Sequence, residues 1–244
     1  MRIGPSTGWL YAKGIYSLSR QEAILNEAGA NSAEICLNGW SADDKRMLSL
    51  REGRVFGSAL LYRSLHLPPL NGDGLENQIA TAVEAVVRSG ATAAVVHPLK
   101  MRGEYPVKHY EKMVAAGIPV AIENMDSKKD SGFNLAELEA LVSTDGCSFV
   151  LDVQHAYEHD PEMGYARDLL ESLKDKLTHI HISGETSDNI HALVCRASNA
   201  KKIVEFTREA LSVKDVPLII EGEYGTPEEL RQEIDFLVRE LAKA

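Results

Sequence analysis

The stretch Thr178-His179-Ile180-His181-Ile182-Ser183-Gly184 alternates polar and apolar residues. Successive side chains of a β-strand point to opposite faces, so His179 and His181 share one face and Ile180 and Ile182 share the other. The pattern predicts a strand over residues 178–182 that packs its isoleucines on one side and presents imidazoles on the other. A polar face of this kind needs partners from neighbouring strands.

Seven other short apolar runs recur along the chain, and helix-patterned segments separate them. Their starts are roughly 25–40 residues apart, which is the length of a βα unit. The predicted strands cover residues 2–6, 33–37, 62–67, 93–97, 120–123, 148–153, 178–182 and 218–221. Eight strands alternating with helices predict a (β/α)₈ TIM barrel, an α/β fold in which residues 1–244 form a single domain. The competing fold is a doubly wound open sheet, but its nucleotide-binding glycine fingerprint and the P-loop are both missing.

Helix boundaries are marked by capping residues. Ser19-Arg20-Gln21-Glu22 reads as a capping box, and Gly29 reads as the end of that helix. Residues 75–89 place Ile79, Val83, Val86 and Val87 on an expected apolar face. Two further N-caps are predicted, by Asn134 with Glu137 and by Thr226 with Pro227 and Glu229.

The composition limits the class of protein. The net charge is −10, and 44% of the residues are hydrophobic, which excludes a disordered or fibrous chain. No run is long enough for a membrane helix, and the first residues lack the apolar core of a secretory signal. Cys36, Cys147 and Cys195 are widely spaced and indicate reduced thiols. We therefore expect a cytoplasmic protein without a membrane partner, for which broad nucleic-acid binding is disfavoured but not excluded.

Metal-capable side chains stand at or near the carboxyl ends of the last six predicted strands. In a barrel these ends meet at one mouth. Three buried carboxylates at this mouth would repel one another unless a cation lay between them, and carboxylates with imidazoles suit Zn²⁺ or Mn²⁺. The joint pattern predicts a divalent metal site among His66, His97, Glu123, Asp152, His181 and Glu221.

Other polar residues near the mouth leave alternatives open. His155 follows Asp152 by three residues and is either a metal ligand or a substrate-binding group. Asp188 and His191 lie in the loop after the seventh strand, where they supply another ligand pair or an ordinary solvated loop. His179 faces inward one layer below His181, and we expect it to pack against or support the site. Glu34 and Glu223 are weaker candidates for the rim.

At these residues the chain resembles the xylose-isomerase-like barrel superfamily, which includes sugar isomerases and epimerases and the apurinic-site endonucleases of the endonuclease IV type. In the isomerase and epimerase branch, the resemblance implies one divalent ion held by Glu123, Asp152, His181 and Glu221. It also implies that His155, in the pattern Asp-x-x-His, contacts substrate oxygens.

The resemblance to this branch further implies a reaction on a small-molecule sugar or sugar phosphate. The metal would chelate oxygens of a hydroxy-ketone or hydroxy-aldehyde, with Glu123 and Glu221 on opposite faces of the reacting carbon. One glutamate would take a proton and the other would return it, through an enediolate-like intermediate stabilised by the metal. Ser187 and Lys129 stand where the ketohexose epimerases carry Arg and Glu, so no specific ketose is implied.

The endonuclease branch implies three zinc ions and hydrolysis of phosphodiesters at abasic sites. Its pattern would use His66, His97 and Glu123 for one ion, and the four-residue set above for the second. The third ion would be held by His155, Asp188 and His191. This sequence departs from that branch at residues 125–129 and in its Asp-x-x-His loop spacing, where the branch has Asp-x-His.

Three hypotheses therefore stand. A metal-dependent isomerase or epimerase with one ion leads, and a zinc-dependent endonuclease with up to three ions is the alternative. A barrel that binds a ligand or partner without catalysis is third, because it leaves the ring of carboxylates unexplained. A homo-oligomer is compatible with the sequence, which does not determine the oligomeric state.

Overall fold

The computed structural model describes residues 1–41, 43–51, 59–70, 74–101 and 103–243. The strands are β1 (Ile3–Pro5), β2 (Ser32–Cys36), β3 (Tyr62–His66), β4 (Ala93–Val96), β5 (Val120–Glu123), β6 (Ser148–Asp152), β7 (Leu177–Ile182) and β8 (Leu218–Ile220). The helices are α1 (Gly8–Ala12), α2 (Leu18–Ala28), α3 (Lys45–Arg51), α4 (Leu75–Ser89), α5 (Val107–Ala115), α6 (Leu135–Val142), α7 (Val153–His159), α8 (Gly164–Leu173), α9 (Ala200–Val213) and α10 (Pro227–Leu241). Short 3₁₀ turns cover Lys174–Lys176 and Val194–Arg196.

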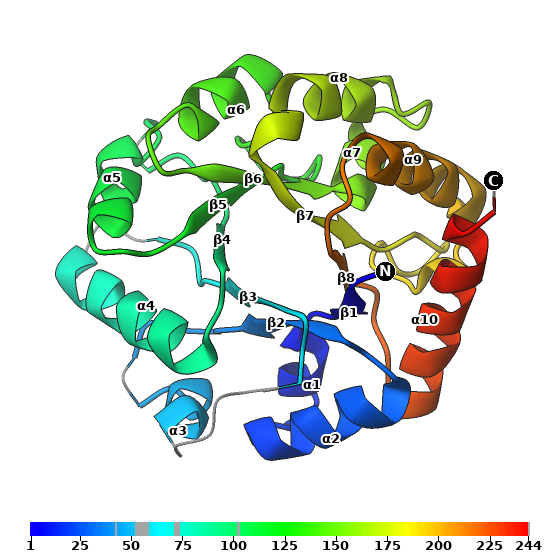
Figure 1. Ribbon diagram of the computed structural model, residues 1–244. Coiled ribbons are helices and arrows are strands. Elements are labelled where there is room, and N and C mark those ends of the chain that lie inside the picture. The colour runs from blue at the N-terminus through cyan, green and yellow to red at the C-terminus, as the bar shows by residue number, and fades with distance from the viewer. Residues whose placement is uncertain (42, 52–58, 71–73, 102, 244) are drawn as a thin grey trace.

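The eight strands form one parallel sheet in the order β1-β8-β7-β6-β5-β4-β3-β2. Backbone contacts between β1 and β2 bring the two ends of the sheet together: Ser6 bridges to Glu34, and the Asn31 N–H donates to the Ile3 carbonyl at 3.0 Å. The helices surround this ring of strands (Figure 1). The predicted (β/α)₈ TIM barrel is confirmed, and the doubly wound open sheet is excluded.

Gly4 allows the last pair of strands to approach. A Cβ atom built at Gly4 would lie 1.6 Å from the carbonyl oxygen of Ser32 on β2. No side chain can occupy that space, because real Cβ atoms do not come that close to backbone oxygen. The closure of the barrel therefore requires glycine at this position.

The core has two parts. Buried aliphatic and aromatic residues fill the layer between the strands and the surrounding helices. Inside the ring, the small residues Ala93, Val95, Ala121 and Val150 pack with the partly buried Tyr62. Polar residues of the barrel interior pair with this small apolar group, as Ser64 does with Ala93 and His179 does with Val150, and further polar residues follow at the carboxyl ends of the strands.

Most of the predicted helix boundaries are confirmed. Asn134 accepts a hydrogen bond from the Glu137 N–H, and Thr226 accepts one from the Glu229 N–H, as N-caps of α6 and α10. Gly29 ends α2 in the left-handed conformation, as predicted. The Ser19 capping box is wrong, because α2 begins at Leu18 with Ser17 in the N-cap position and Ser19 lies inside the helix.

The bounds of α4 are as predicted, and its apolar face is confirmed in part: Ile79 is buried and Val83 and Val86 pack against the core. Gln78, Ala82 and Ala85 are buried, whereas Val87 is 74% exposed. At about 100° per residue, Val87 lies about 180° around the helix from Gln78. The small side chains of Ala82 and Ala85 allow this helix to lie close to the strands, and this packing fixes which face is buried.

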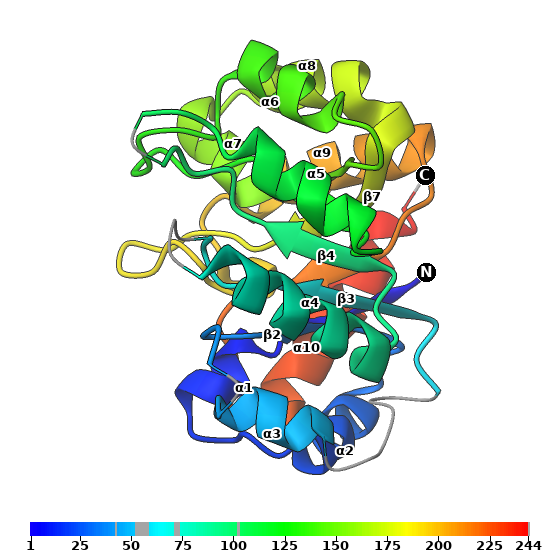
Figure 2. The same ribbon diagram turned by 90° about the vertical axis from the view of Figure 1, so that its left-hand side faces the viewer.

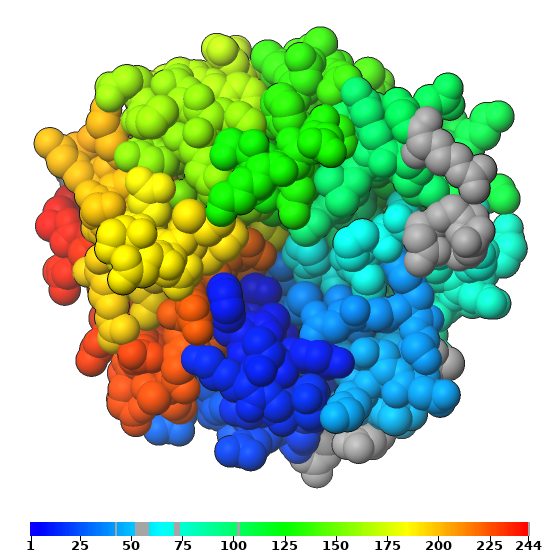
Figure 3. All heavy atoms as spheres, turned by 180° about the vertical axis from the view of Figure 1, so that it is seen from behind, coloured from blue at the N-terminus to red at the C-terminus, as the bar shows by residue number. Residues whose placement is uncertain are grey.

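The carboxyl ends of the strands point to one side of the molecule (Figure 2). The space-filling view of that side shows a hollow between the segment around α1 and the connection from β7 to α9 (Figure 3). Among the described residues, no helix is long and apolar enough to span a membrane.

We predict that Gly4→Ala lowers the free energy of unfolding by at least about 3 kcal/mol, because β1 and β2 must separate to accommodate the methyl group. Gly39→Ala is the matched control, since among the described residues a Cβ at Gly39 would meet only Asp44 Oδ2, at 3.8 Å. Urea unfolding followed by circular dichroism measures both. Equal stability of the two variants would contradict the proposed closure.

Candidate metal centre

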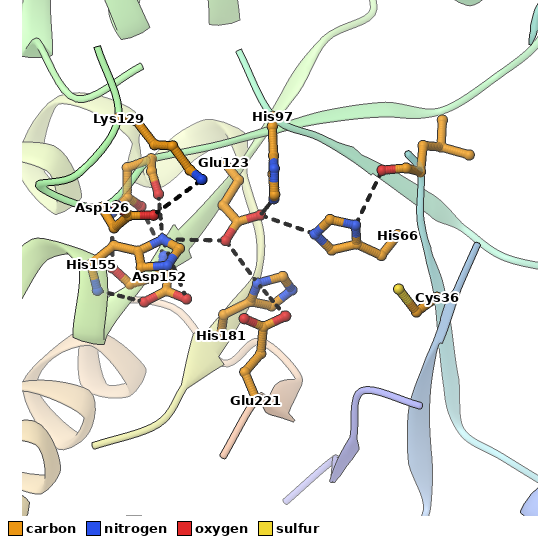
Figure 4. Close-up of polar contacts among 12 residues, drawn as sticks. Cys36, His66, His97, Glu123, Asp126, Lys129, Asp152, His155, His181 and Glu221 are labelled. Atoms are coloured by element: carbon orange, nitrogen blue, oxygen red, sulfur yellow. Dashed lines mark hydrogen bonds and ion pairs between the residues drawn. The ribbon is translucent and has the colours of Figure 1, made fainter. Parts of the chain in front are cut away.

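Four side chains from adjacent strands converge at the carboxyl end of the barrel. Glu123 ends β5, Asp152 ends β6, His181 lies on β7, and Glu221 follows β8 directly. Each offers one ligand atom, and these atoms all lie within 4.8 Å of one another. The register of the sheet produces this arrangement, because a shift between Phe149 and Val150 pairs Asp152 directly with His181. Figure 4 shows the cluster.

His181 is the centre of the cluster. Its side chain is fully buried, and its Nδ1 lies 3.2 Å from Glu123 Oε1 and 3.3 Å from Glu221 Oε1. Glu123 is 1% exposed, whereas the Glu221 side chain is 15% exposed. The site is therefore closed on the Glu123 side and accessible beside Glu221.

The two carboxylate oxygens of Asp152 have different roles. Oδ1 accepts the His155 N–H at 2.7 Å and caps α7. Oδ2 is buried without a hydrogen-bonding partner in the described structure. The Asn124 side chain binds the backbone of Asp152. Asn124 Oδ1 accepts the Asp152 N–H at 2.8 Å, and Asn124 Nδ2 donates to the Asp152 carbonyl at 2.9 Å. Helix capping and the Asn124 side chain thus fix Asp152 with one oxygen left for a ligand.

A second group adjoins the first and shares Glu123. The Nε2 atoms of His66 and His97 lie 3.5 Å and 3.3 Å from Glu123 Oε2. Neither histidine forms a hydrogen bond with Glu123 Oε2, which has no hydrogen-bonding partner in the described structure. His66 Nδ1 lies 3.2 Å from the Leu67 carbonyl and would donate to it, which leaves Nε2 as the nitrogen that an ion would bind. These three groups converge as ligands do.

The residues present fit a divalent cation. Glu123 Oε2 and Asp152 Oδ2 are buried oxygens without hydrogen-bonding partners in the described structure. Buried polar atoms are normally satisfied, and a buried carboxylate without compensation costs several kcal/mol. Carboxylate oxygen and imidazole nitrogen are the donor types that zinc and similar ions take in proteins.

The loop residues are only partly brought together. His155 Nδ1 lies 2.9 Å from the Asn124 carbonyl, and the His155 ring meets the His191 ring edge-on at 5.6 Å between centroids. Asp188 is exposed and accepts a hydrogen bond from the Ser187 hydroxyl. Among the described residues, no group of converging ligand atoms includes His155, Asp188 or His191. The structure does not assemble these three as the set for a third ion.

Glu34 lies deeper than the rim position that the sequence suggested. It is fully buried inside the barrel, where Oε2 accepts a hydrogen bond from Ser64 Oγ at 2.8 Å and lies 3.2 Å from His181 Nε2. His179 joins this layer below His181, as expected. In the sequence, Glu34 stands within an apolar strand, two positions before Cys36. Strand periodicity therefore places the two side chains on the same face. The sequence does not predict the role of Asn124, because the Asn124 side chain binds the backbone of a neighbouring strand.

The cluster is strongly coupled electrostatically. Burial would raise the pKa of Glu123, but His181 and the other imidazoles beside it hold that pKa well below its usual value. Burial raises the pKa of Glu221 to about 7, and repulsion from Glu123 and Asp152 adds to this effect although His181 opposes it. Burial also opposes the charged form of His66, yet Glu123 beside it raises the pKa to about 9.

A pocket of about 260 Å³ opens beside this cluster. Its walls include Trp9 from α1, Cys36, His66, His191 and Glu221. The Trp9 indole donates to the Glu221 carbonyl at 2.7 Å, so the aromatic wall is anchored to the residue that carries the exposed carboxylate.

Comparison with solved structures supports the fold. A D-tagatose 3-epimerase-like protein aligns with a TM-score of 0.72 and 16% identity, covering 99% of this chain and 97% of that chain. Endonuclease IV from Thermus thermophilus aligns with a TM-score of 0.72 and 18% identity over 100% of both chains. A xylose isomerase domain containing protein from Salmonella typhimurium aligns with a TM-score of 0.70 and 15% identity, covering 99% and 97%.

A scan against protein-family models and a search of curated proteins found no match. The structural neighbours are those that the sequence resemblance implied. The chain therefore has the fold of the xylose-isomerase-like barrels.

We predict that Asn124→Ala weakens zinc binding about tenfold, because Asp152 loses the side chain that positions its backbone. The free energy of unfolding should fall by about 1–3 kcal/mol from the unsatisfied buried groups. Asn134→Ala, which removes a helix cap, is a control of similar cost that should leave zinc affinity unchanged. Calorimetric titration with zinc measures both variants, and equal affinities would contradict the role of Asn124.

Proposed function

We propose that this protein is a metal-dependent isomerase or epimerase acting on a sugar or sugar phosphate. The observation that carries the proposal is the convergence of Glu123, Asp152, His181 and Glu221 at the carboxyl end of the barrel, with ligand atoms within 4.8 Å of one another. Barrel enzymes place their active sites at this end. A pocket lined by Glu221 and His66 would give a small molecule access to the edge of this group.

The bound ion would be one divalent cation, zinc or manganese. When bound, it would polarise neighbouring oxygens of a hydroxy-ketone or hydroxy-aldehyde and stabilise the negative charge that develops on them. All four residues would hold the ion through carboxylate oxygens and His181 Nδ1. His66 lines the pocket, and His155 is buried near the cluster. Both would hold substrate oxygens, because each uses its Nδ1 toward a backbone carbonyl and leaves Nε2 available.

Proton transfer is assigned to the two glutamates. One carboxylate removes the proton from the carbon next to the carbonyl, and the electron pair moves onto the carbonyl oxygen. The other glutamate starts in its protonated form and returns that proton to carbon. Return to the opposite face of the same carbon, while the electron pair re-forms the carbonyl, gives an epimer. Return to the neighbouring carbon, together with transfer of the hydroxyl proton on that carbon to the former carbonyl oxygen, gives an aldose–ketose isomer. The position of Glu221 at the pocket and of Glu123 on the closed side of the cluster supports this assignment.

A second candidate is hydrolysis of phosphodiesters at abasic sites by zinc ions. The observation that favours it is the group of His66, His97 and Glu123, which supplies a second set of ligands sharing Glu123 with the first. A shared carboxylate is typical of two-metal sites. The exposed position of Asp188 does not support the three-ion form of this candidate.

Glu123→Gln tests the leading proposal. The variant should bind divalent metal at least about tenfold more weakly, because one anionic ligand shared by both groups is lost. It should also lose solvent-hydrogen exchange into sugars and sugar phosphates incubated in heavy water with zinc or manganese. Glu111→Gln removes an exposed glutamate on α5 and serves as the matched control. Full metal occupancy in Glu123→Gln would eliminate the proposed centre.

Metal stoichiometry separates the candidates. We expect elemental analysis of the purified holoprotein to find close to one divalent ion per chain, with no nicking of an abasic duplex when zinc is supplied. Two or more zinc ions per chain together with nicking would replace the isomerase by the endonuclease. A metal-free protein whose melting temperature does not change with chelator or added metal would favour a barrel that binds a ligand without catalysis.

A further inference from the structure

A layer of buried polar side chains lies directly below the candidate metal centre. Glu34 is fully buried on β2, and its Oε2 faces Ser64 Oγ at 2.8 Å, His181 Nε2 at 3.2 Å and His179 Nε2 at 3.4 Å. Its Oε1 has no hydrogen-bonding partner in the described structure. A carboxylate at this depth is costly. Its position therefore calls for a task that an apolar residue could not perform.

The two ring nitrogens of His181 face opposite ways. Nδ1 faces Glu123 and Glu221, where the ion would lie. Nε2 faces Glu34 Oε2 at 3.2 Å. A neutral imidazole has one N–H donor and one acceptor nitrogen. Nε2 also lies 3.1 Å from His179 Nε2, which is itself 3.4 Å from Glu34 Oε2, so both imidazoles can donate to this carboxylate. With an ion on the Nδ1 side, the lone pair belongs on Nδ1 and the proton belongs on Nε2, where it faces the Glu34 oxygen.

We propose that Glu34 is the positioning residue of His181: by accepting the Nε2–H, it keeps Nδ1 as the metal-binding nitrogen and fixes the plane of the ring. The inference rests on the metal centre of the proposed function. It adds that Nε2 is the nitrogen held by Glu34 and Nδ1 is the nitrogen that faces the ion. A carboxylate behind a metal-bound histidine acts in this way in metal sites generally.

The rest of the layer holds Glu34 and His179 in place. Ser64, on the neighbouring strand β3, donates to Glu34. The Tyr62 hydroxyl lies 2.8 Å from His179 Nδ1, and His179 Nε2 lies 3.1 Å from His181 Nε2. These residues come from β2, β3 and β7, which are distant in sequence. The rigid ring of strands therefore determines the orientation of His181.

Glu34→Leu and Glu34→Gln test the inference. Leucine removes the acceptor, whereas glutamine removes the charge but keeps a carbonyl oxygen of the same reach. We expect zinc affinity to fall about 10–100-fold in Glu34→Leu and less in Glu34→Gln. Glu233→Gln is the control, because Glu233 is also fully buried but accepts the N–H groups of Val194 and Cys195 instead. Its zinc affinity should stay within about twofold of the unmodified protein, and melting curves confirm that each variant is folded.

The decisive readout is the ring proton itself. In protein labelled with ¹⁵N-histidine, long-range ¹H–¹⁵N spectra report which nitrogen of His181 is protonated, with assignment from the signal lost in His181→Asn. We expect a slowly exchanging Nε2–H in the unmodified protein with zinc bound. Glu34→Leu should lose this slow exchange, and Glu34→Gln should retain part of it.

Each outcome bears on one claim. An unprotonated Nε2 in the unmodified protein with zinc bound, or a Glu34→Leu variant with unchanged ring proton and zinc affinity, would overturn the role of Glu34. An unmodified protein that binds no zinc, yet shows an Nε2–H that depends on Glu34, would support this inference while contradicting the metal centre of the proposed function.

Discussion

The whole site depends on the repulsion among carboxylates that the barrel buries at one end. Glu34, Glu123 and Asp152 are each nearly or fully inaccessible, and Glu221 stands beside them. Their charges would oppose folding if no cation balanced them. The imidazoles of His66 and His181 supply that balance in part when protonated, and a divalent ion would supply it without occupying the nitrogens with protons. Folding and metal binding are therefore linked through the same few side chains.

The barrel satisfies this constraint by giving single residues two tasks. Asp152 caps α7 with one oxygen and leaves the other free, so the start of a helix fixes the orientation of a candidate ligand. Asn124 holds the Asp152 backbone from the neighbouring strand. At the opposite edge of the sheet, Gly4 permits the close approach of β1 and β2 that brings Glu34 into the interior. Strand register, helix capping and barrel closure thus act together on the geometry of the site.

Much of this arrangement could be predicted from the sequence. The alternation around His181 and the polar residues at the strand ends are local signals, because strand periodicity and parallel topology place them at one mouth. The depth of Glu34 was not predictable, since it depends on which residue of β2 lies opposite β1 and β3. The sequence does not decide whether Asp188 is a ligand or a solvated loop residue, because a loop carries no periodicity that places its side chains. The predicted apolar face of α4 is confirmed for Ile79, Val83 and Val86 and wrong for Val87, because Ala82 and Ala85 shift the centre of the buried face.

The central claim is that one divalent ion lies among Glu123, Asp152, His181 and Glu221. Anomalous X-ray diffraction from crystals grown with zinc, recorded on both sides of the zinc absorption edge, tests it most directly. We expect one dominant anomalous peak within about 2.0–2.3 Å of a carboxylate oxygen of each acidic residue and of His181 Nδ1. A dominant peak elsewhere, or bonded to His181 through Nε2, would contradict it.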